Sequence, residues 1–277
     1  MQKVRGNIYV ETGFHGCNVS FIATGDGVVL IDTPQVPSEA RKWKKEIERF
    51  GPIRFVINNE PHSDHITGDF FFDGLLVAHE GAAEAMQKTQ VSMIEDMLKR
   101  IAPESLPLPA GYLIRVPDIT FSQNMTIRLG GLTFNLLLMP GHTPFQVATY
   151  IPEEKIIFTS DNVVTGGQPF LHQAVPYQWL DSLRKIGDMD VETIVPGHGP
   201  LCDKSYLNQM ENTIKTWIKM VEDAMDRGLS SAEAQDSIRF KDYFPDAPDD
   251  EFLRPMRRMM IAHLYEELTK NRRKQSG

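Results

Sequence analysis

The stretch EPHSDH at residues 60–65 directly follows an apolar run that is typical of a buried strand. Four of its six side chains, those of Glu60, His62, Asp64 and His65, can bind a metal ion. The proline at its second position favours an extended backbone, in which alternate side chains point the same way. Glu60, His62 and Asp64 would then share one direction while His65 turns away, which predicts ligands for two adjacent metal ions. A surface turn with Asp64 as a helix cap is the alternative.

Three further candidate ligands follow later predicted strands. His142 and His198 each come after such a strand, inside a turn rich in proline and glycine, and Asp161 follows a strand that is expected to end at Ser160. Because a rigid sheet can hold side chains within the tolerance that a metal ion needs, we expect one metal centre at these strand ends. Its seven candidate ligands are Glu60, His62, Asp64, His65, His142, Asp161 and His198.

This ordered set of residues resembles the metallo-β-lactamase superfamily, whose signature His-x-His-x-Asp-His is followed by a separate His, Asp and His. The strand that ends in Asp32-Thr33 is similar to that superfamily too, and the resemblance covers about residues 6–200. It implies an α/β (α+β) fold of the αββα sandwich type, with a two-metal site, usually zinc, at one edge of the sheets.

The resemblance also implies how the ligands are shared. Glu60, His62 and His142 would hold the first metal ion. Asp64, His65 and His198 would hold the second. Asp161 would bridge both ions, as in the glyoxalase II, lactonase and phosphodiesterase branches.

Glu60 departs from the family pattern, which has histidine at this position. With two divalent ions, the third carboxylate lowers the charge of the site to about +1 instead of +2, which weakens Lewis acidity and raises the pKa of bound water. Oxygen ligation also favours Mn or Fe over Zn at the Glu60 site. A Glu60 side chain that turns outward and leaves a single metal ion is the alternative.

Two metal ions about 3.5–4 Å apart activate a hydroxide held between them and polarise an electrophile. We therefore expect a dinuclear metallo-hydrolase that attacks a small-molecule ester, lactone, thioester, amide or halogenated electrophile. Asp64 would be both a ligand and a catalytic residue that orients the hydroxide. His15 and His172 are candidate catalytic donors to an oxyanion or a leaving group, with an exposed polar histidine as the alternative for each.

Two other functions remain open at this point. Glu60 and its oxygen ligation would also suit an iron-dependent, dioxygenase-like redox enzyme on the same fold. The third reading is a non-catalytic metal-binding protein that keeps the seven residues for structure.

The composition limits the partners. The 277 residues include 29 Lys+Arg and 37 Asp+Glu, which gives a net charge of −8, whereas nucleic-acid binding rests on basic residues that neutralise phosphates. We expect a small-molecule substrate and no nucleic acid. Whether the chain forms a homo-oligomer stays open. The two cysteines suit a reducing cytoplasm, and without an apolar stretch of about 18 residues no membrane span is expected.

The spread of the ligands from residue 60 to residue 198 requires a single core domain. We expect the sandwich core at residues 1–204, and a helical extension at 205–277 that packs on the same domain. Helical periodicity covers Ser205–Arg227 and Glu251–Thr269, with an acidic connector at Asp242–Asp250 between them.

Overall fold

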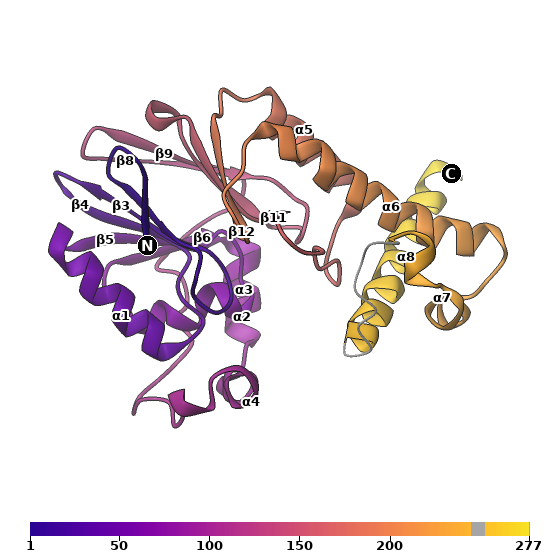
Figure 1. The fold of residues 1–277 in the computed structure, drawn as a ribbon, viewed down its shortest axis with the longest axis horizontal. Helices are drawn as coiled ribbons and strands as arrows, with labels where there is room; N and C mark the ends of the chain where they lie inside the picture. The colour runs from indigo at the N-terminus through magenta and orange to yellow at the C-terminus, as the bar shows by residue number, and fades with distance from the viewer. Residues whose placement is uncertain (245–252, 277) are drawn as a thin grey trace.

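In the computed structural model, which describes residues 1–244 and 253–276, two β-sheets pack face to face between layers of helices (Figure 1). The first sheet runs in the order β1 to β7, and its last four strands, β4 to β7, are parallel neighbours. Its strands are β1 (Gln2–Arg5), β2 (Ile8–Glu11), β3 (Val19–Thr24), β4 (Gly27–Ile31), β5 (Ile53–Ile57), β6 (Leu75–His79) and β7 (Ile119–Phe121).

The second sheet has the order β12-β11-β10-β9-β8, and only β11 and β12 in it run parallel. Its strands are β8 (Asn124–Leu129), β9 (Leu132–Leu138), β10 (Val147–Ile151), β11 (Ile156–Val164) and β12 (Thr193–His198). The helices are α1 (Pro37–Ile47), α2 (Ser63–Ile66), α3 (Glu80–Lys88), α4 (Val91–Ile101), α5 (Pro176–Asp188), α6 (Leu207–Asp226), α7 (Ser231–Ser237) and α8 (Arg254–Ser276).

Three apolar layers hold the sandwich together. Between the sheets, side chains such as Ile57 and Phe134 are fully buried in one cluster. On the outer face of the first sheet, Trp43 of α1 packs against Phe21 and other apolar strand residues. On the outer face of the second sheet, Trp179 of α5 belongs to a third cluster with helices α6 and α8. The structure therefore confirms the predicted αββα sandwich.

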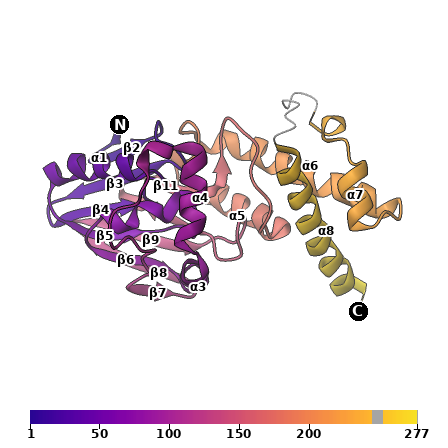
Figure 2. The ribbon, with the colours of Figure 1, turned by 90° about the horizontal axis from the view of Figure 1, so that it is seen from below.

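Helices α6, α7 and α8 lie together at one end of the molecule (Figure 2). Leu264 and Leu268 of α8 are buried in the same apolar cluster as Trp217 of α6 and Ile157 of β11. The division into a core at 1–204 and an extension at 205–277 stays a prediction. Most of the predicted acidic connector, at residues 245–250, lies outside the described residues.

Several predicted elements differ in their bounds. The helical pattern of residues 80–101 would suit one helix, but the segment forms two, α3 and α4, because the backbone is extended at Thr89 and Gln90. The strand that was expected to end at Ser160 continues to Val164, so Asp161 lies inside β11 and not after it. Helix α7 lies between the two helical stretches expected at 205–227 and 251–269 and was not predicted. In the part of the chain that the structure describes, no helix combines the length and apolar character needed to cross a bilayer.

Candidate metal centre

The turn after β5 is tied to both sheets and fixes the start of the site. Asn59 donates from its backbone N to Asp32 Oδ1 (2.9 Å) and from Nδ2 to the carbonyl of Phe158 in β11 (3.2 Å). The carbonyl of Asn59 accepts from Val147 N in β10 at 2.9 Å. Because these partners come from two sheets, the next residue, Glu60, has little freedom to move.

The EPHSDH stretch is extended only as far as His62. His62 has φ −66° and ψ 151° and precedes Ser63, the first residue of α2. Asp64 and His65 therefore lie in the first turn of a short helix, and the alternation expected of an extended strand does not apply to them. The residue at the helix cap is His62, so the alternative with Asp64 as the cap is wrong.

One group of ligand-type atoms brings together Glu60, His62 and His142. Glu60 Oε2 contacts His62 Nδ1, and His142 Nε2 lies 3.1 Å from His62 Nδ1 and 3.6 Å from Glu60 Oε2. The other ring nitrogen of His142, Nδ1, is 2.7 Å from the carbonyl of Phe170. Because that carbonyl can only accept, Nδ1 carries the proton and the lone pair of Nε2 faces the group.

A second group contains Asp64, His65 and His198. Asp64 Oδ2 lies 3.2 Å from His198 Nε2 and 3.6 Å from His65 Nε2. Asp161 connects this group with the first, because its Oδ1 is 3.4 Å from His65 Nε2 and 3.3 Å from His198 Nε2, whereas its Oδ2 is 3.8 Å from His142 Nε2. All seven candidate ligands are thus brought together.

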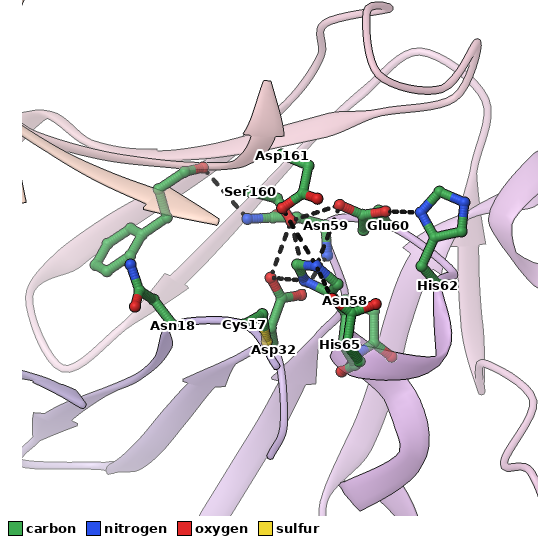
Figure 3. Close-up of polar contacts among 12 residues, drawn as sticks. Cys17, Asn18, Asp32, Asn58, Asn59, Glu60, His62, His65, Ser160 and Asp161 are labelled. Carbon is green, nitrogen blue, oxygen red and sulfur yellow. Dashed lines mark hydrogen bonds and ion pairs between the residues drawn. The ribbon is translucent and has the colours of Figure 1, made fainter. Parts of the chain in front are cut away.

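Glu60 is fully buried and directed into the site (Figure 3). Its Oε2 faces the first group, while its Oε1 is 3.3 Å from His65 Nε2 in the second. The outward orientation that would leave one metal position is therefore absent. The resemblance to the superfamily motif implied that Glu60 binds the first metal ion alone. A motif specifies the type of residue and not where each carboxylate oxygen points, so it could not show that Glu60 faces both groups.

Two buried residues outside the predicted set orient the ligands. Asp32 Oδ2 lies 3.0 Å from His65 Nδ1, so the opposite nitrogen of that ring faces the cluster. Ser160 Oγ donates to Glu60 Oε1 at 3.1 Å and lies 3.2 Å from Asp32 Oδ2. Asp32 and Ser160 both have positive φ, 54° and 45°. Asp32 could have been found from the sequence, because it follows the apolar run of β4 directly. No sequence pattern marks Ser160 as a residue that contacts the ligands.

The atoms present suit a divalent metal ion. His65 Nε2 and Asp161 Oδ1 are buried and lie 3.4 Å apart, and neither has a hydrogen-bond partner among the described residues. Buried polar atoms without partners are rare and costly in folded proteins, and a shared cation would satisfy both. Four imidazoles and three carboxylates are donors that Zn, Mn and Fe all accept.

The imidazoles and carboxylates also shift one another's pKa values. Burial lowers the pKa of His198, but the carboxylates of Asp161 and Asp64 outweigh burial and raise it to about 10. Burial raises the pKa of Asp64, yet His65 and His198 hold it at about 2. A cation at these nitrogens competes with protons, so metal binding is expected to release protons and to weaken in acid.

His172 lies beside the centre, whereas the imidazole of His15 pairs with Glu39 of α1. His172 and His62 line the same cavity of about 280 Å³, with their ring centroids 5.0 Å apart. Burial, with His62 and His142 nearby, lowers the pKa of His172 to about 4, so its ring is neutral at pH 7. His15 is exposed and its Nδ1 lies 2.9 Å from Glu39 Oε1 on α1. The catalytic roles of both histidines stay predictions.

Comparison with known proteins agrees with this geometry. The family model described as the metallo-beta-lactamase superfamily matches residues 12–198. A beta-lactamase-like protein 2 homolog from Caenorhabditis elegans is 25% identical over 192 residues, which cover 68% of this chain and 58% of that protein. This chain therefore spans less than two thirds of the length of that relative. A metallo-beta-lactamase type 2 from Elizabethkingia meningoseptica is 24% identical over 232 residues, which cover 78% of this chain and 85% of that protein.

A solved structure extends the likeness of fold to nearly the whole chain. A metallo-beta-lactamase family protein from Thermus thermophilus superimposes with a TM-score of 0.69 over 97% of this chain and 94% of its own, at 15% sequence identity. The helices after residue 204 are therefore part of a shared architecture.

Proposed function

The chain belongs to the metallo-beta-lactamase superfamily, and from that premise we propose that it is a hydrolase that uses two divalent metal ions, zinc or, with Glu60, manganese or iron. Its substrate would be a small molecule with an ester, lactone, thioester, amide or halogenated electrophilic centre. The observation that carries the proposal is the convergence of seven ligand-type side chains in two groups, which a further group of Glu60, His65 and Asp161 connects.

Different residues of the chain have different roles in the proposed reaction. When bound, the metal ions supply Lewis acidity and lower the pKa of water. Asp32 and the carbonyl of Phe170 hold the rings of His65 and His142 with Nε2 toward the centre. Asp64, in the same cavity wall as His172, accepts a hydrogen bond from the water or the substrate and so orients it.

Removal of metal provides the direct test of this proposal. A chelator is expected to abolish hydrolysis of p-nitrophenyl acetate, a thioester and a lactone, and two equivalents of Zn or Mn are expected to restore it, because no other group in the proposal activates water. Metal content is measured by elemental analysis beside each rate. Metal-free protein that still hydrolyses its substrate at the full rate would contradict the proposal, and stoichiometric iron with oxygen consumption would favour the redox alternative.

Glu60→His tests whether Glu60 is a ligand. Because Glu60 is buried and directed inward, we expect two ions per chain in both the wild type and the variant. The imidazole removes one negative charge and replaces the two carboxylate oxygens by a nitrogen donor, so the preference for Zn over Mn should rise by about tenfold. Competitive dialysis with elemental analysis measures both quantities, and Glu60→Gln is the control that removes the charge but keeps the shape. A rise from one ion to two in Glu60→His would show that Glu60 is not a ligand.

A further inference from the structure

A second cavity, of about 540 Å³, lies next to the metal centre and is walled by the segment 166–170 and by residues of the C-terminal helices. We call this cavity the aromatic chamber. Six side chains supply most of its apolar lining, namely those of Trp217, Phe240, Tyr243, Phe244, Met256 and Met260. A volume of this size is typical of small-molecule sites and far exceeds the voids of a close-packed core.

The aromatic walls of the chamber support one another. Phe240 and Phe244 stack with ring centroids 4.7 Å apart, and Trp217 lies 5.3 Å from Phe240 and 5.7 Å from Phe244. The indole N–H of Trp217 donates to Gln168 Oε1 at 3.2 Å. Trp217 is fully buried, and because its polar atom already has a partner, it contributes only apolar ring atoms to the wall of the chamber.

The chamber and the metal-centre cavity share a wall. Phe170 and Met256 line both cavities. The carbonyl of Phe170 lies 2.7 Å from Nδ1 of the candidate ligand His142, and the next residue, Leu171, donates from its backbone N to Met260 Sδ of the chamber at 3.1 Å. One short segment therefore connects the chemistry of the first cavity with the apolar lining of the second.

We propose that the aromatic chamber binds an aliphatic chain of the substrate, a medium-length acyl or alkyl group, while the bond to be cleaved lies at the metal centre. The chemistry at the metal centre rests on the proposed function, whereas binding of the chain does not. Aromatic rings and methionine side chains favour hydrocarbon over charged groups because burial of apolar surface drives the binding. The one charged residue of the described lining, Arg257, has its guanidinium over the ring of Phe240 at 4.2 Å.

Binding of 1-octanol to the full metal-loaded protein tests the chamber without any reaction. All three tryptophans of the chain are fully buried, but only Trp217 is among the described lining residues of the chamber. Trp179 lies elsewhere in the same apolar cluster, and Trp43 lies in the cluster under α1. We expect a saturable change of tryptophan fluorescence in the wild type and none in Trp217→Phe. No saturable change, or the same change in Trp217→Phe, would overturn the proposal.

Phe244→Ala is expected to reduce the preference for long chains. Burial of each methylene group favours binding by up to about fourfold, so the wild type should prefer p-nitrophenyl octanoate over the butanoate by at least about tenfold in kcat/KM. Phe244→Ala should lower this ratio by about fivefold. The matched control is Phe50→Ala, because Phe50 is also half-buried and contacts two aromatic rings, but on the outer side of the first sheet.

The two proposals fail in distinguishable ways. If octanol binds but neither ester is cleaved, the chamber stands and the hydrolase function fails. If both esters are cleaved with equal kcat/KM and octanol does not bind, the hydrolase function stands and the chamber proposal is wrong. An equal ratio of kcat/KM for the octanoate over the butanoate in Phe244→Ala and Phe50→Ala would also overturn the assignment of Phe244 to the chain-binding wall.

Discussion

Asp161→Asn is expected to lower metal-dependent hydrolysis by more than about 100-fold and to reduce bound metal below two ions per chain. Both oxygens of Asp161 are used, Oδ1 near His65 and His198 and Oδ2 near His142. Asparagine keeps one oxygen but replaces the other by an NH₂ group that cannot bind a cation. Loss of a residue that merely orients a ligand costs about 10–100-fold, so loss of a shared ligand should cost more.

The measurement combines elemental analysis with the rate for an ester substrate after dialysis against excess metal. Asp190→Asn is the matched control, because Asp190 is exposed and pairs with Lys155, outside the seven candidate ligands. If Asp161 had only a structural role, Asp161→Asn would change the stability of the fold and leave the number of bound metal ions unchanged. Two tightly bound ions and a normal rate in Asp161→Asn would therefore contradict the assignment of Asp161 as a shared ligand.

The sequence contains enough local information to predict which ligand-type side chains come together, because strand ends and turn residues are short-range features. His142 could be found in this way, since it lies in a Pro/Gly turn after a β-run. His198 could be found too, although β12 continues through Pro196 and Gly197, so that His198 is its last residue and does not lie in a turn after it. The structure brings Asp161 together with the other candidate ligands although its strand continues to Val164. Every residue of Ile156–Val164 is buried, polar ones included, so no change in pattern marks where the strand ends.

Other features could not be predicted, because they depend on contacts between distant parts of the chain. The reach of Glu60 into both groups depends on the orientation of its side chain, which no pattern in the sequence specifies. The aromatic chamber combines residues 166–170 with Trp217 and Phe240, which lie far later in the sequence. The spacing of Met256 and Met260 equally suits a helix face that packs in a core, a dimer or a cavity wall.

Gly197→Ala is expected to destabilise the fold by about 1–3 kcal/mol, the usual cost of an overpacked site, and to reduce metal binding at the same time. A Cβ at position 197 would lie 2.6 Å from the carbonyl carbon of Ser160 and 2.7 Å from Asp161 N, and it would overlap Asp161 Oδ1. Gly197 lies in β12, which pairs with β11 along the buried edge of the site. The strands must therefore separate or Asp161 must move.

Urea unfolding and elemental analysis of the same samples measure the two effects. The matched control is Gly25→Ala, because a Cβ at Gly25 meets no atom within 4 Å in the turn between β3 and β4. We expect that control to keep both its stability and its metal content. If Gly197→Ala matches Gly25→Ala in both, the close approach of β12 to Asp161 does not set the geometry of the centre. If stability falls but metal content is unchanged, the backbone yields and Asp161 keeps its place, which would separate the packing role of Gly197 from ligand positioning.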